Sequence, residues 1–194
     1  MHYCQSMKSL IGNTPIVKLE HLNFPRAVSL FAKLELYNPS GSVKDRIGIY
    51  MIQKAEQQGL LKPGSTIIEA TAGNTGLGIA FAALNTAYHV ICIVPTKFSR
   101  EKQLLMQALG AEVINTPKEE GMFGAERKAK ELLSSIPDSI SLEQFKNQNN
   151  PLAHYETTGP EIYRDLDGQI DYCLLYTSPA LVFQIAYTVA FPAA

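Results

Sequence analysis

The stretch that decides the fold is residues 65–94, STIIEATAGNTGLGIAFAALNTAYHVICIV. It opens on a β-like run, Ser65–Ala70, and closes on His89–Val94, an apolar and β-branched run of the kind that is buried on both faces of a sheet. Between these runs, Asn74–Leu84 can form a helix. A strand, a helix and a second strand in this order predict parallel strands with a helix packed on their face.

The same alternation continues after residue 94. Ser99 is a good N-cap for a helix over Ser99–Leu109, and Gly110 occupies a position where glycine commonly ends a helix. Further elements are predicted as strands at Ala111–Asn115 and Ser139–Leu142 and as a helix at Met122–Leu133. The complete βαβαβαβ order predicts an α/β fold in which helices flank a parallel sheet.

Additional elements lie on both sides of this middle part. Before it, the sequence predicts strands at Pro15–Leu19 and Ser29–Leu34 and a helix with one apolar side at Val43–Gln57. After it, the sequence predicts a helix at Pro160–Leu166 and a strand at Ile170–Leu175. A second lobe would therefore be assembled from both flanks.

The composition excludes several classes of protein. With 46% hydrophobic and 18% charged residues over 194 positions, the chain has the composition of a globular protein rather than a disordered one. Its net charge of −1 argues against nonspecific binding to nucleic acid, which depends on excess Lys and Arg. Cys4, Cys92 and Cys173 form no CxxC pair and no zinc-ligand spacing, which predicts no metal site and a reducing cytoplasm.

The first candidate for chemistry is Lys44, in the run NPSGSVKDR at residues 38–46. Ser42 is a good N-cap, so Lys44 falls in the first turn of the predicted helix, where the helix dipole disfavours the ammonium form. Such a lysine is partly neutral and can act as a nucleophile toward a carbonyl carbon. The alternative from the residues alone is an exposed lysine beside Asp45 and Arg46.

The second candidate is the turn EATAGNTGLG at residues 69–78, which joins a predicted strand to a predicted helix. Its small residues let backbone N–H groups approach a carboxylate or phosphate at the helix N-terminus. The glycines are spaced GxxGxG, and the next strand ends on Val94 and Pro95 without an acid, so a dinucleotide site is not indicated. The alternative is a tight turn without a ligand.

The third candidate is Gln144, in the run QFKNQNNP that follows the predicted Ser139–Leu142 strand. The carboxyl ends of parallel strands meet at one edge of the sheet, where ligands bind. Gln144 would thus lie at the same edge as Thr71 and Thr75, although a plain polar loop is the alternative.

Together these clusters resemble the cysteine synthase and cystathionine β-synthase group of fold-type II pyridoxal-phosphate enzymes, which have a tryptophan synthase β-like fold. The resemblance runs from Leu10 to about Cys173. It is carried by several motifs in the family's order: LIGNTPIVKL, NPSGSVKDR, EATAGNTGLGIA, VPTKFSREKQ, LGAEV, GMFGA, QFKNQNNP and TTGPEIY. It implies a partial larger lobe from residues 1–44 and 151–175 and a smaller mobile lobe over residues 45–150.

The resemblance also implies roles for individual residues. Lys44 matches the lysine to which pyridoxal 5'-phosphate is covalently attached, and Asn74 matches the asparagine that hydrogen-bonds the ring hydroxyl oxygen of this cofactor. Gln144 matches a glutamine that serves the substrate carboxylate. The loop that grips this carboxylate is matched by Thr71, Ala72, Gly73, Asn74 and Thr75. Ala72 replaces a serine that is common in cysteine synthases, which would remove one hydroxyl contact.

The activity implied is β-replacement on O-acetylserine with sulfide, giving cysteine and acetate. The EATAGNTG and KFSREKQ forms also resemble O-acetylserine-dependent cystathionine β-synthases, in which the thiol of homocysteine would be the acceptor; serine is an alternative donor. A homodimer is implied for the full-length enzyme.

The resemblance stops near Cys173. The family has a glycine- and threonine-rich loop for the cofactor phosphate where this chain reads Tyr176-Thr177-Ser178-Pro179. The last 23 residues carry no charge, and the nearly apolar run Ala180–Phe191 is shorter than the roughly 20 residues of a membrane span. We therefore expect residues 176–194 to be foreign to the family and the chain to be truncated. The alternatives to an enzyme are a nucleotide-binding domain and an inactive fragment that binds a carboxylate or a partner.

Overall fold

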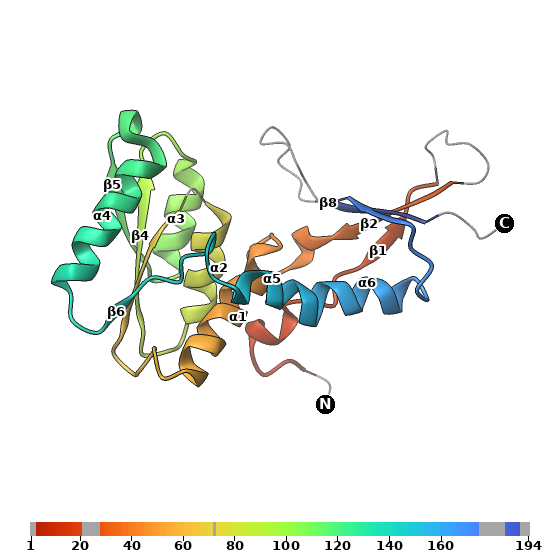
Figure 1. The fold of residues 1–194 in the computed structure, drawn as a ribbon, viewed down its shortest axis with the longest axis horizontal. Coiled ribbons are helices and arrows are strands. Elements are labelled where there is room, and N and C mark those ends of the chain that lie inside the picture. The colour runs from red at the N-terminus through yellow and green to blue at the C-terminus, as the bar shows by residue number, and fades with distance from the viewer. Residues whose placement is uncertain (1–2, 21–27, 72, 175–184, 191–194) are drawn as a thin grey trace. The chain divides into compact units, whose positions relative to one another are not determined.

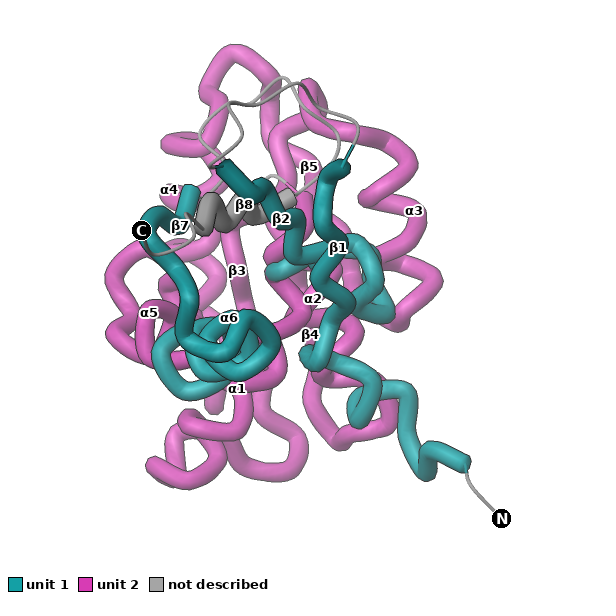
Figure 2. The backbone as a smooth tube through the Cα atoms, turned by 90° about the vertical axis from the view of Figure 1, so that its right-hand side faces the viewer, with its two compact units in different colours: residues 1–43, 154–194 teal, residues 44–153 magenta. Residues whose placement is uncertain are grey.

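The computed structural model describes residues 3–20, 28–71, 73–174 and 185–190. The chain forms two compact units. One unit comprises residues 1–43 and 154–194, and the other comprises residues 44–153 (Figure 2).

The unit of residues 44–153 is built on a four-stranded parallel sheet with the strand order β5-β4-β3-β6. Its strands are β3 (Thr66–Ala70), β4 (His89–Pro95), β5 (Glu112–Thr116) and β6 (Ser139–Ile140). β3 and β4 are buried along nearly their whole length, as their β-branched sequences predict. The predicted parallel sheet with flanking helices is therefore confirmed.

Helices cover both faces of this sheet (Figure 1). Ile67, Val90 and Cys92 point to a core that α1 (Lys44–Gln57), α2 (Asn74–Ala83) and α3 (Arg100–Ala108) complete. The alternate strand residues Ile68, Ile91 and Ile93 pack on α4 (Gly121–Ser135) on the opposite face. The short helix α5 (Asn149–Ala153) packs against α1.

Two glycines set the distance between α1 and α2. A Cβ built at Gly48 would lie 2.5 Å from the carbonyl carbon of Gly78. A Cβ at Gly78 would in turn collide with the backbone carbonyl oxygen of Lys44. Because both positions lack a side chain, the first turn of α1 lies directly against α2.

The unit of residues 1–43 and 154–194 contains a second sheet, in the order β1-β2-β8-β7. All its pairings between described strands are antiparallel, so the expectation of parallel sheets holds for one unit only. Its strands are β1 (Ile16–Lys18), β2 (Ser29–Leu34), β7 (Tyr172–Leu174) and β8 (Ile185–Ala190). Its helices are the 3-10 turns Met7–Leu10 and Glu35–Tyr37, the π-helical turn His154–Thr158, and α6 (Gly159–Asp165).

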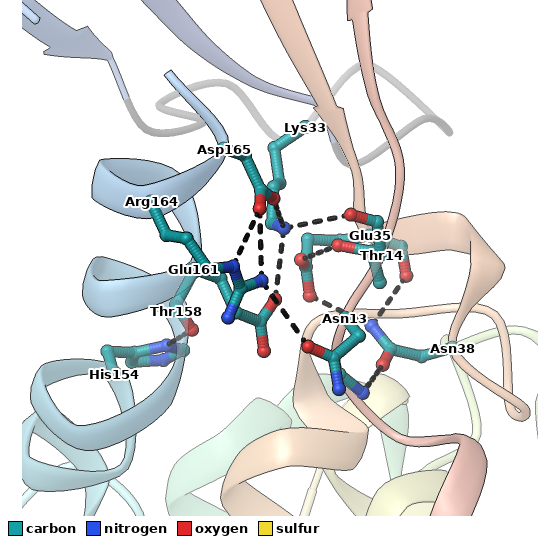
Figure 3. A network of polar contacts seen from close by, with 11 residues as sticks. Asn13, Thr14, Lys33, Glu35, Asn38, His154, Thr158, Glu161, Arg164 and Asp165 are labelled. Atoms are coloured by element: carbon teal, nitrogen blue, oxygen red, sulfur yellow. Dashed lines mark hydrogen bonds and ion pairs between the residues drawn. The ribbon is translucent and has the colours of Figure 1, made fainter. Parts of the chain in front are cut away.

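A buried polar network joins β2 to α6 inside this unit (Figure 3). The ammonium of Lys33 is fully buried and lies 2.9 Å from Glu161 Oε2 and 3.3 Å from Asp165 Oδ2. It also donates to the carbonyl oxygen of Thr14 at 2.8 Å. The Glu35 carboxylate accepts from the Thr14 hydroxyl at 2.7 Å and from Asn38 Nδ2 at 2.8 Å. Ionic contacts therefore hold together segments that lie far apart in the sequence.

Most elements lie close to their predicted ranges. Ser99 caps α3 as expected, since its hydroxyl oxygen accepts a hydrogen bond from the amide of Lys102 at 3.3 Å. α5 was not predicted, because Asn149, Asn150 and Pro151 are typical loop residues. β8 was also not predicted, and residues 176–184 and 191–194 of the expected foreign tail lie outside the described residues. Within the described part of the chain, no helix has the length and apolar character needed to cross a membrane.

Candidate functional site

The strand order reverses between β3 and β6. The chain passes from β3 to β4 to β5 on one side and then returns to β6 on the other side of β3. In open α/β sheets, ligands bind outside the carboxyl ends of the strands at the point where the order reverses in this way. The loops that leave β3 and β6 here contain Thr71 and Gln144, two of the predicted site residues.

Thr71 shapes the turn between β3 and α2. Its hydroxyl oxygen accepts hydrogen bonds from the amide of Gly73 at 3.2 Å and from the amide of Gly76 at 3.1 Å. A Cβ at Gly76 would lie 2.7 Å from Thr71 Cγ2 and 2.9 Å from Met106 Cε, so glycine permits the close approach. Thr71 therefore fixes the backbone of the turn, and its hydroxyl donates no hydrogen bond to a described residue.

The first turn of α2 presents donors that an anion can use. The amide of Gly76 is occupied by Thr71, whereas the amides of Asn74 and Thr75 make no hydrogen bond with a described residue. The first amides of a helix have no partner within the helix and carry its positive partial charge. The turn is therefore chemically suited to a carboxylate.

The side chain of Gln144 reaches this turn. Thr75 Oγ1 donates a 2.5 Å hydrogen bond to Gln144 Oε1, and both residues are buried. The NH₂ group of Gln144 makes no hydrogen bond with a described residue. It can therefore donate to a ligand bound at the first turn of α2.

Glu69, at the carboxyl end of β3, is a member of this site to which sequence reasoning assigned no role. Its side chain is buried, and its carboxylate accepts from the hydroxyl of Ser141 and from the amides of Leu142, Glu143 and Gln144. Burial raises the pKa of this carboxyl above its ordinary value, while the four hydrogen bonds act in the opposite direction. An acid inside an otherwise apolar strand was the signal that could have identified it.

Lys44 lies in the first turn of α1, as predicted, although the helix begins at Lys44 and not at Val43; it is partly buried beside Gly78 of α2. Burial lowers the pKa of its ammonium below the ordinary value. A lowered pKa agrees with the predicted nucleophilic lysine, although the cause found here is burial and the cause predicted was the helix dipole.

The structure thus brings several predicted residues into one unit. Thr71, Gly73, Asn74, Thr75 and Gln144 surround the carboxyl edge of β3, and Lys44 lies on the helix packed against α2. Ala72 lies outside the described residues, as do Thr177 and Ser178 near the expected phosphate loop. No group of three or more His, Cys, Asp or Glu side chains that could hold a metal ion occurs among the residues described.

A cavity of about 420 Å³ opens beside Glu69 and Gln144. Lys130 on α4 and Lys146 after β6 contribute positive charge to its lining, and Glu126 and Glu143 contribute negative charge. The cavity lies between α4, the end of β3 and the segment after β6, and no described residue of the turn at residues 71–76 lines it.

Comparisons with known proteins identify the family of the chain. Residues 7–179 match the family described as "Pyridoxal-phosphate dependent enzyme". An O-acetylserine dependent cystathionine beta-synthase of Bacillus subtilis is 51% identical over 161 residues, which are 83% of this chain and 52% of that protein. A probable cysteine synthase of the same organism is also 51% identical, over 158 residues that cover 81% of this chain and 51% of that protein.

Solved structures give the same result. The O-acetylserine dependent cystathionine beta-synthase of Helicobacter pylori has a TM-score of 0.82 and 46% identity, with 88% of this chain and 56% of that chain covered. The cystathionine beta-synthase of Bacillus anthracis has a TM-score of 0.72 and 52% identity, with 88% and 64% covered. These matches confirm the fold-type II α/β architecture.

The chain spans about half the length of the curated relatives that it matches. The family match nevertheless covers most of the chain, and it includes Lys44, the turn after β3 and Gln144. The chain therefore belongs to the family of pyridoxal-phosphate dependent enzymes.

Proposed function

We propose that this chain carries part of the active site of an enzyme that performs β-replacement on O-acetylserine with sulfide and forms cysteine and acetate. The observation that carries the proposal is the hydrogen bond between Thr75 and Gln144 across the β3–β6 edge, beside amides at the start of α2 that make no hydrogen bond with a described residue. This arrangement suits the α-carboxylate of an amino acid.

The residues present also fit the family's cofactor. Lys44 has the lowered pKa that a lysine needs to bond to the aldehyde carbon of pyridoxal phosphate, and Asn74 stands at the start of the neighbouring helix. When bound, pyridoxal phosphate supplies an electron sink for the α-carbon of the substrate. Lys44 and Asn74 would hold it at the carboxyl edge of β3.

Groups of the chain would also bind the substrate carboxylate and transfer the α-proton. The amides of Asn74 and Thr75, together with the NH₂ group of Gln144, bind and orient the substrate carboxylate. The amine of Lys44 accepts the α-proton at Nζ, because its lowered pKa leaves more of it unprotonated at a given pH. The Cβ–O bond then breaks with loss of acetate, a Cβ–S bond forms with the incoming sulfide, and Lys44 Nζ returns the proton to the α-carbon.

A second acceptor is supported by the comparisons. The relatives at 51% identity include both an O-acetylserine dependent cystathionine beta-synthase and a probable cysteine synthase. With the thiol of homocysteine as acceptor, the same residues would form cystathionine. Supplying O-acetylserine with either sulfide or homocysteine and comparing kcat/KM for the two products distinguishes these activities.

The cofactor test separates an enzyme from an inactive fragment. Pyridoxal phosphate is added to the 194-residue chain, and the visible absorption band of the cofactor bound covalently to a lysine is recorded. We expect Lys44→Ala to abolish the band and Lys62→Ala, on an exposed residue of the same unit, to retain it. A band that survives Lys44→Ala would contradict the assignment, and a wild-type chain without a band would favour the inactive fragment.

The homodimer and the cytoplasmic location stay predictions.

A further inference from the structure

Glu69 is a buried acid whose charge is met by hydrogen-bond donors rather than by a cation. Its residue is 3% exposed, and it forms no ion pair with a described residue. Isolated buried carboxylates are costly unless several donors satisfy them. Loss of these donors would therefore leave the buried carboxylate of Glu69 without hydrogen-bond partners.

All four donors come from one short segment after β6. Glu69 Oε2 accepts from Ser141 Oγ at 2.9 Å, from the Leu142 amide at 3.1 Å and from the Glu143 amide at 3.3 Å. Glu69 Oε1 accepts from the Gln144 amide at 3.4 Å. Three consecutive amides that point at one carboxylate fix the path of the backbone, because each bond constrains a successive peptide group.

The segment is therefore held at two points. Glu69 at the end of β3 binds the backbone of Gln144, while Thr75 on the first turn of α2 binds its side chain. Glu69 lies just before the turn of residues 71–76, and Thr75 lies within it. The two contacts together determine where the NH₂ group of Gln144 lies.

We propose that Glu69 is a positioning residue, which fixes Gln144 so that its NH₂ group faces the carboxylate-binding turn of α2. The inference rests on the proposed function, because it assigns to Glu69 a role in binding the amino-acid carboxylate. Glu69 acts through Gln144 and does not itself touch the substrate.

The carboxylate of Glu69 is chemically required for this role. A carboxylate offers only acceptors, which suits four donors that converge on it. A glutamine at the same place has nearly the same shape but turns one acceptor into an NH₂ donor, which would face an amide. Glu69→Gln therefore places one donor opposite another donor while leaving the packing volume almost unchanged.

Amide hydrogen exchange in the 194-residue chain tests the geometry without any ligand. We expect Glu69→Gln to accelerate exchange at the amides of Leu142 and Gln144 about tenfold, the ratio that corresponds to one lost hydrogen bond. The amides of Ile91 and Ile93 on β4 should keep their protection. The matched control is Glu143→Gln, which makes the same change one residue from Gln144 on an exposed acid paired with Lys146. Equal exchange in the two variants would overturn the proposal.

Substrate binding tests the functional part. The affinity for O-acetylserine is measured in chain loaded with pyridoxal phosphate, for Glu69→Gln, Gln144→Ala and the double variant. Because Glu69 acts through Gln144, we expect Glu69→Gln to weaken binding about tenfold alone and to add almost nothing in the Gln144→Ala background.

The two tests distinguish a failure of the Glu69 proposal from a failure of the proposed function. Fully additive losses would contradict positioning through Gln144, since a general loss of folded structure would also add. A wild-type chain that binds no O-acetylserine would contradict the proposed function, and the exchange rates would still decide whether Glu69 holds the Gln144 segment.

Discussion

The hydroxyl of Thr75 donates a 2.5 Å hydrogen bond to Oε1 of Gln144 across 69 positions of sequence. The bond connects the first turn of α2 with the segment after β6, and these two elements follow neighbouring strands of the parallel sheet. It orients the Gln144 carboxamide so that its oxygen is occupied and its NH₂ group is available. The carboxylate site that we propose depends on this orientation.

Thr75→Val replaces the hydroxyl with a methyl group of similar size. Because Gln144 Oε1 then stays buried without its donor, we expect the free energy of unfolding to fall by about 1–3 kcal/mol. Urea unfolding measures the change, with Thr75→Ser as the matched control that retains the hydroxyl. Equal losses in both variants would show that packing, rather than the hydrogen bond, is responsible.

Lys44 should react with aldehydes at lower pH than exposed lysines do. Burial lowers the pKa of its ammonium, so the reactive neutral amine is present at a pH where a fully exposed amine is still protonated. Pyridoxal phosphate followed by borohydride reduction at about pH 7 should label Lys44 before other lysines, as read by peptide mass spectrometry. Preferential labelling of the exposed Lys146 would contradict this expectation.

The sequence was sufficient to predict the parallel unit because its signals are local. Apolar runs such as His89–Val94, the cap at Ser99 and the small residues of the turn at residues 71–76 each indicate a structure within a few positions. Repeated in order, they determine a sheet edge at which Gln144 meets Thr75. Topology alone predicts that both residues lie at this edge, and the structure shows in addition that their side chains form a hydrogen bond.

The contacts between distant segments could not be predicted, because no local pattern indicates which residues are partners. Nothing near Glu69 in the sequence shows that its partners are Ser141 and the three amides that follow it. The burial of Lys33 depends likewise on Glu161 and Asp165, which are more than a hundred positions away. The antiparallel pairing of β2 with β8 joins the two ends of the chain, so no local pattern of residues could indicate it.

Gly78→Ala tests the contact between α1 and α2. The added Cβ would collide with the carbonyl oxygen of Lys44, and overpacking of this kind costs about 1–3 kcal/mol. Alanine normally favours a helix over glycine, so a loss of stability would have to come from the contact. Thermal and urea unfolding measure it, and Gln53→Ala on an exposed position of α1 is the control. A more stable Gly78→Ala variant would contradict the close approach of the helices.

Lys33→Met tests the buried ionic network of the other unit. The substitution removes the cation that lies 2.9 Å from Glu161 and 3.3 Å from Asp165, and breaking a buried pair from one side costs about 3–5 kcal/mol. We expect Lys18→Met, an exposed position on β1, to change the free energy of unfolding by less than about 0.5 kcal/mol. Similar unfolding midpoints for the two variants would show that the network contributes little to stability.

Glu69 also gives the stability of the chain a dependence on pH. Because burial raises the pKa of its carboxyl in the folded state, the folded chain holds this proton at a pH where the unfolded chain has lost it. The contribution of Glu69 to stability is therefore complete below the ordinary pKa of a glutamate and falls as the pH rises through the folded-state pKa.

Glu69→Gln has no proton to lose at this position. We expect the free energy of unfolding of the wild type, minus that of Glu69→Gln, to be larger at about pH 4 than at about pH 7 in urea titrations. Glu143→Gln, on an exposed acid, provides the reference. A difference that grows with pH would mean that the four hydrogen bonds outweigh burial and hold the Glu69 pKa below its ordinary value.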